Sequence, residues 1–139
     1  MFLAAADGRT ILFTGDGRGD HILRGLREIG LLGDDGTLHV DVLKVPHHGS
    51  SRNTTRAFYR QVTADVYVIC ADGSHANPDY TTLRWIVECA HAQGRPIDLF
   101  ITSLTPSVER LLKRYDAAVY GYRIITLAAD QHALTLELV

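Results

Sequence analysis

The chain has 139 residues, a length that suits one compact domain and leaves no room for a second domain with its own core. Apolar residues make up 46% and charged residues 22%, which is the balance of a folded globular protein and not of a disordered one. There are 14 lysine and arginine residues against 16 acidic residues, a net charge of -2, so charge does not support nucleic-acid binding.

The apolar segments and the cysteines indicate neither a membrane protein nor a secreted scaffold. No uncharged apolar run approaches the roughly 20 residues that a bilayer-spanning helix needs, and residues 1–30 lack the order of a signal peptide. The cysteines, Cys70 and Cys89, each lie in an apolar segment, where we expect small buried side chains with inert thiols. We therefore expect a cytoplasmic protein in a reducing compartment.

Local signals along the chain predict strands that alternate with helices. A turn at Asp7-Gly8 between two short apolar runs predicts a β-hairpin at the start of the chain. Asp20 is expected to cap the first helix, and Asn77 to cap a longer helix with Pro78 at its first position. The other expected elements are strands over 39–45, 65–71 and 97–102, helices over 54–63 and from 105 onward, and a hairpin of strands 122–127 and 133–139.

This order predicts a single α/β domain over residues 1–139, with a mixed β-sheet and flanking helices. Strands separated by helices form parallel pairs, and the hairpins expected at both chain ends add antiparallel ones. The pattern leaves open whether the helices cover one face of the sheet or both.

Two loops that follow expected strands carry the candidate chemistry. The first holds Asp16 and the second holds His47 and His48, and strand ends of this kind commonly border a ligand crevice. An aspartate beside glycine is also what a tight turn favours, so Asp16 taken alone is most simply a turn residue. Together, a carboxylate and imidazoles are typical ligands of zinc, manganese or iron. His75, after the next strand, is placed to approach the same edge, although support of the Asn77 cap is its simpler role.

At these motifs the sequence resembles the metallo-β-lactamase-fold hydrolases, especially the branch similar to the hydrolase domain of competence proteins. The resemblance is carried by ILFTGDG at residues 11–17, DVLKVPHHGSS at residues 41–51 and the loop at residues 72–79, and it fades after residue 100. It implies that Asp16 bridges two metal ions and that the histidine pair holds the family's last metal-binding histidine. His48 is the favoured ligand, with His47 near the substrate, and the reverse assignment stays open.

The sequence also departs from that family. Its His-x-His-x-Asp-His loop and a further histidine before the aspartate are absent here. The chain therefore resembles one half of the family's αββα four-layer sandwich, the C-terminal half, with the N-terminal metal-binding half missing. The two loops supply at most two strong ligands, whereas a catalytic zinc usually takes three, so we expect weak metal binding or none by this chain alone.

The resemblance implies hydrolysis of an ester or phosphodiester with two zinc ions, or manganese or iron, in the complete fold. It implies catalytic roles for Asp16 and His47, and substrate contacts from His47, Gly49, Ser50 and His75. We expect the isolated chain to be weakly active or inactive. The alternative is a non-catalytic half-fold that acts as an assembly or interaction module through the sheet face that the lost half would cover. Both interpretations predict a homo-oligomer or a partner that supplies the missing half, and neither predicts binding to a membrane. The enzyme interpretation also predicts a small-molecule or phosphodiester substrate.

Overall fold

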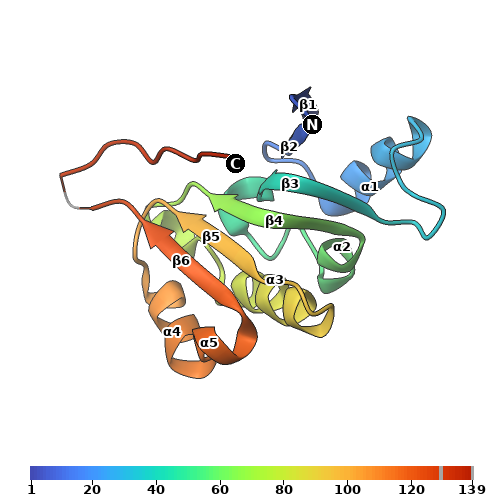
Figure 1. Ribbon diagram of the computed structural model, residues 1–139. Helices are drawn as coiled ribbons and strands as arrows, with labels where there is room; N and C mark the ends of the chain where they lie inside the picture. The colour runs from blue at the N-terminus through green and yellow to red at the C-terminus, as the bar shows by residue number, and fades with distance from the viewer. Residues whose placement is uncertain (129, 139) are drawn as a thin grey trace.

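A six-stranded mixed β-sheet with flanking helices forms the protein in this computed structural model, which describes residues 1–128 and 130–138 (Figure 1). The strands lie in chain order across the sheet, from β1 at one edge to β6 at the other. The strands are β1 (Phe2–Ala6), β2 (Arg9–Phe13), β3 (Leu38–Lys44), β4 (Val62–Ile69), β5 (Ile97–Ile101) and β6 (Tyr122–Thr126). The helices are α1 (Gly19–Glu28), α2 (Arg56–Gln61), α3 (Tyr80–Ala92), α4 (Pro106–Arg114) and α5 (Ala117–Tyr120), with 3-10 turns η1 (Pro46–Gly49) and η2 (Ser74–Ala76).

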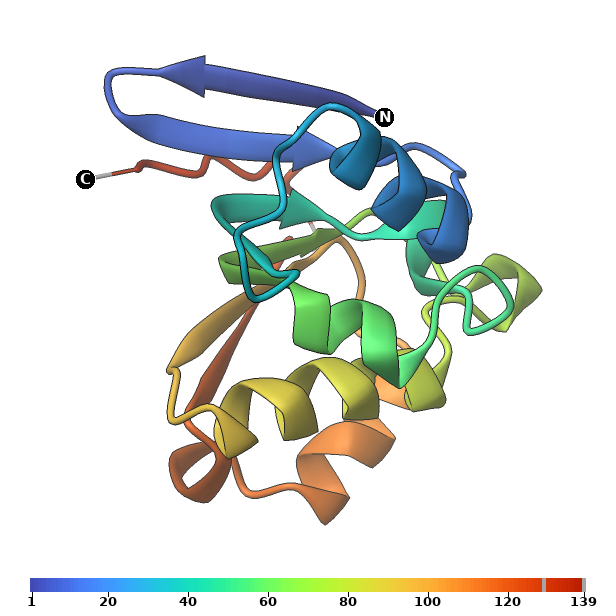
Figure 2. The same ribbon diagram turned by 90° about the vertical axis from the view of Figure 1, so that its right-hand side faces the viewer.

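The strand order explains why the helices share one face of the sheet. β1 and β2 form the expected antiparallel hairpin, and every later strand pairs in parallel with the one before it. Crossovers between parallel strands are almost always right-handed, so an order that never reverses puts every crossover helix on the same side. Figure 2 shows α1 to α4 on one side of the sheet. The helices thus cover a single face.

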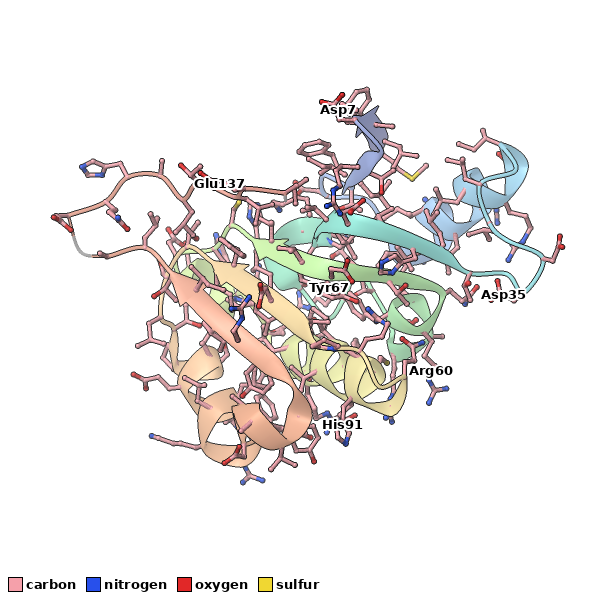
Figure 3. All side chains as sticks on the ribbon, in the orientation of Figure 1. Asp7, Asp35, Arg60, Tyr67, His91 and Glu137 are labelled. Carbon is pink, nitrogen blue, oxygen red and sulfur yellow. The ribbon has the colours of Figure 1, made fainter. Side chains whose placement is uncertain are left out.

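The core lies between the sheet and this helix layer. Leu43, Tyr67 and Leu99 sit side by side on β3, β4 and β5 and are almost fully buried (Tyr67 is labelled in Figure 3). Leu83 and Ile86 of α3 are equally buried against them. Burying one such side chain contributes about 1.5–3 kcal/mol relative to leaving it exposed. This layer therefore holds the strands, and the loops at their ends, in place.

The opposite face of the sheet is covered differently. Lys44, Val68 and Phe100 form a row across β3, β4 and β5 there and are half-buried. Residues 130–138 of the C-terminal segment run along this side toward the β1–β2 hairpin (Figures 1 and 2). In Figure 3 its Glu137 lies on the side of the molecule away from Arg60 and His91 of the helix layer. On this face, the described part of the chain has this extended segment and no helix layer.

The prediction of a hairpin at the C-terminus is wrong. β6 pairs in parallel with β5, and residues 130–138 form no strand; Val139 lies outside the described residues. The prediction rested on leucines that alternate with polar residues. In the structure Leu134, Leu136 and Leu138 are half-buried while Thr135 and Glu137 are exposed, so the alternation reflects an extended segment with one covered side and no pairing partner.

Two predicted helix caps are also wrong, one because its side chain has another partner and one because the helix begins later in the chain. α1 begins after Arg18, and the Asp20 carboxylate accepts hydrogen bonds from the Arg18 guanidinium at 3.1 and 2.9 Å. α3 begins at Tyr80, after Asp79, whereas Asn77 ends the turn η2.

None of the helices within the described residues is long and apolar enough to cross a bilayer.

Asp41 on β3 ties the hairpin to the rest of the sheet. Its carboxylate accepts hydrogen bonds from Arg9 Nη1 at 2.9 Å and from the Thr10 backbone at 2.8 Å. The Arg9 guanidinium, together with Thr10, lowers the pKa of Asp41 from 3.8 to about 2. A group whose pKa is lowered by folding stabilises the protein above its unfolded pKa, and that contribution disappears as the pH falls through the folded pKa.

We expect Asp41→Asn to lower the free energy of unfolding at pH 7 by about 1 kcal/mol, a value that allows for solvent screening of the half-exposed Arg9. Urea unfolding measures the difference, which should shrink between pH 4 and pH 2. Asp34→Asn, in an exposed loop, is the control and should change stability by less than about 0.5 kcal/mol. Equal stability of Asp41→Asn and wild type at pH 7 would contradict this role of Asp41.

Candidate metal site at the carboxyl ends of three strands

Three neighbouring strands end at the same edge of the sheet, and the loops that follow them carry the candidate residues. Asp16 follows β2, His47 and His48 lie in η1 after β3, and His75 lies in η2 after β4. Because β2, β3 and β4 are parallel neighbours, their carboxyl ends meet. Asp16 and His48, 32 positions apart (48 − 16), come together: His48 Nε2 is 3.9 Å from Asp16 Oδ1.

The His48 ring is oriented by the backbone of β4's end. Its Nδ1 lies 2.6 Å from the carbonyl oxygen of Cys70. A carbonyl only accepts hydrogen bonds, so Nδ1 carries the hydrogen and Nε2, the atom facing Asp16, carries the lone pair of the neutral ring. Metal-bound histidines usually show this arrangement, one nitrogen fixed by an acceptor and the other free to bind.

His47 is held by a different set of contacts. Its backbone N–H donates to the Gly15 carbonyl at 3.0 Å, and its ring Nδ1 lies 2.6 Å from Asn53 Oδ1. The ring lines a cavity of about 410 Å³ together with Ser50 and Arg52. His48 and Cys70 line a second cavity, of about 350 Å³. His75 lines both cavities, so it borders the space beside each of the two histidines of η1.

The backbone of η1 and η2 adopts conformations that residues other than glycine rarely take. The φ angles of His47, His48 and His75 are 45°, 55° and 54°, in the left-handed region. Such strain of about 1–3 kcal/mol per residue persists only where the surroundings impose it, and it is often found at functional sites.

The start of α3 imposes this shape on η1. The Asp79 backbone N–H donates to the Gly49 carbonyl at 3.0 Å. In return, the Asp79 carboxylate accepts from the backbone N–H and the hydroxyl of Ser51, at 2.7 and 2.8 Å. Ser50 is buried in the same loop, with 7% of its surface exposed. These contacts fasten the loop just after the histidine pair, and the His47 N–H bond to the Gly15 carbonyl fastens it at the pair itself.

Asp16 and His48 provide donor chemistry that suits zinc, manganese or iron, a carboxylate oxygen beside an imidazole nitrogen. Both side chains are accessible, with exposed fractions of 71% and 49%. Within residues 1–128 and 130–138, no group of three or more His, Cys, Asp or Glu side chains is placed to hold a metal ion. The pair could therefore supply two ligands of a metal site, and a complete site needs at least one more.

Two residues that orient the histidines at this site were not predicted from the sequence, Cys70 and Asn53. Cys70 was expected to be buried, but β4 ends at Ile69 and leaves Cys70 exposed, with its carbonyl orienting His48; Cys89 is buried as expected. The contact of Asn53 with His47 was not anticipated either. No sequence motif predicts these roles, since Cys70 acts through its main-chain carbonyl and Asn53 through its side-chain amide.

Gly49 offers a test of how the site is held. Its φ is +84°, and a Cβ there would lie 2.7 Å from Pro78 Cβ. We expect Gly49→Ala to cost about 2–4 kcal/mol in urea unfolding, from backbone strain plus the clash. Gly30→Ala is the matched control, since Gly30 has a φ of +69° and nothing within 4 Å of the added Cβ. It should cost only about 1–2 kcal/mol. Equal losses in the two variants would show that the Pro78 contact does not constrain η1.

No family model, curated protein or solved structure matches this chain.

Proposed function

We propose that Asp16 and His48 are two metal ligands of a metal-dependent hydrolase that cleaves an ester or phosphodiester. The distance of 3.9 Å between His48 Nε2 and Asp16 Oδ1 is the observation that carries this proposal. The contact of His48 Nδ1 with the Cys70 carbonyl supports it, because it leaves Nε2 available to a metal ion. The resemblance of the two loops to those of metallo-β-lactamase-fold hydrolases supports the reaction class.

In this proposal a bound zinc, manganese or iron ion supplies Lewis acidity and an acidified water. Asp16 and His48 hold the ion at the edge of the sheet. The substrate lies in the adjoining cavity, whose walls include His47, Ser50 and His75. Gly49 leaves room for the close approach of Pro78, since an added Cβ would lie 2.7 Å from Pro78 Cβ. Further ligands come from a partner or from the half of the family fold that this sequence does not resemble, so the isolated chain has weak activity or none.

Binding of Mn²⁺ to the isolated chain tests the ligand pair, since a paramagnetic ion broadens nearby NMR signals even when it binds weakly. We expect the signals of Asp16 and His48 to broaden first. Asp16→Ala and His48→Ala should each weaken binding by tenfold or more, because either change leaves a single ligand. His39→Ala is the control, since His39 contacts Thr63 and Asp65 far from these loops. Unchanged Mn²⁺ binding in both ligand variants would refute the proposal.

A second candidate function, assembly through apolar surface, is favoured by the β1 edge. β1 contains no charged residue and has no strand on its outer side among the described residues. Uncharged edge strands are prone to pair with other chains. Met1, Phe2 and Phe13 are 53%, 65% and 44% exposed, and the two phenylalanine rings lie 6.1 Å apart. The Phe2–Phe13 pair forms an exposed apolar surface at the edge where a second copy would add to the sheet.

Light scattering tests this assembly. One chain has a mass of 15.4 kDa, and we expect at least twice that value. Phe2→Lys should shift the protein toward single chains by adding a charge to the edge. Val119→Lys is the matched control, because Val119 is 66% exposed on α5, and it should leave the mass unchanged. A well-folded wild-type protein with the mass of one chain would count against the assembly.

A further inference from the structure

Asn53 connects the two loops of the candidate site. Its Oδ1 lies 2.6 Å from His47 Nδ1, and its Nδ2 donates to the Asp16 carbonyl at 3.3 Å. We propose that Asn53 is a positioning residue that fixes His47 as a hydrogen-bond acceptor toward the adjoining cavity and ties it to the Asp16 loop. This inference builds on the proposed function, since it assigns His47 a role beside the Asp16–His48 pair.

The orientation of the Asn53 amide follows from its second contact. The main-chain oxygen of Asp16 only accepts hydrogen bonds, so the amide atom that faces it must be the NH₂ group. The carbonyl oxygen of Asn53 therefore faces His47. Since that oxygen also only accepts, His47 Nδ1 must carry the hydrogen. The tautomer of His47 is thus set by a backbone group on another loop, through Asn53.

The backbone of Asn53 is itself held in place. Its carbonyl accepts from the Gly19 N–H at 2.7 Å, at the start of α1, and its own N–H donates to the Ser50 carbonyl at 3.3 Å. The side chain is half-buried. Asn53 therefore reaches His47 and Asp16 from a fixed position and is not a freely moving surface amide.

This geometry changes the role expected of His47. With the hydrogen on Nδ1, the neutral ring presents the lone pair of Nε2, which has no hydrogen-bond partner among the described residues. Such a nitrogen accepts a hydrogen bond from a water or a hydroxyl group. It does not donate one to a phosphoryl or carbonyl oxygen. The residue expected to donate to substrate oxygens is then the Ser50 hydroxyl in the same cavity.

Imidazole ¹⁵N NMR of the metal-free chain, at a pH where the rings are neutral, tests the proposal. We expect wild-type His47 and His48 both to carry the hydrogen on Nδ1, held by Asn53 and by the Cys70 carbonyl. In Asn53→Ala, His47 should shift to mainly the Nε2–H form, which solvated neutral imidazoles favour, while His48 stays unchanged. Asn53→Asp keeps an acceptor beside Nδ1 and should restore the Nδ1–H form of His47.

Ser51→Ala is the control for general loosening of the loop, since it removes the hydroxyl contact with Asp79 but none with His47. It should leave both tautomers as in wild type. The proposal is overturned if wild-type His47 carries its hydrogen on Nε2, if Asn53→Ala changes nothing, or if Ser51→Ala has the same effect. The wild-type spectrum alone decides the first of these, whether or not the variants fold. Mn²⁺ binding that is unchanged in Asp16→Ala and His48→Ala, with these tautomers intact, would reject the metal site and leave the role of Asn53 standing.

Discussion

The parallel pairing of β2, β3 and β4 is the constraint on which the candidate site depends. Asp16, His48 and Cys70 are far apart in the chain, and only the shared direction of these strands brings them to one edge of the sheet. Given this parallel pairing, the right-handedness of the crossovers also assigns every crossover helix to one face of the sheet. Fold and site are therefore two results of one topology.

The histidine pair illustrates how much of a site is made by its supports. His47 and His48 are adjacent in sequence, yet each ring is oriented by a different element, Asn53 after η1 in one case and the end of β4 in the other. The strained backbone of η1 is held by the hydrogen bonds with Asp79 at the start of α3. The chemistry of two residues thus draws on contacts from three other parts of the chain.

The sequence was a good guide where the signal was local. The Asp7-Gly8 turn and the alternation of strands with helices are confirmed, because turn chemistry and hydrophobic period act within a few residues. It failed where the outcome depended on which of several possible partners a segment takes. Asp20 pairs with Arg18 instead of capping α1, and the leucines of residues 133–138 line an unpaired segment. Asp16 and His48 were found through their motifs, but nothing local marks Asn53 or a main-chain carbonyl.

The orientation of His48 by a carbonyl has a practical consequence for position 70. Because the acceptor belongs to the main chain, the identity of the side chain there does not determine the hydrogen bond. Cys70 is exposed and lines the cavity beside His48, whereas the other thiol, Cys89, is buried. A fluorophore or spin label attached to this sulfur would report on the surroundings of the ring without removing the atom that holds it.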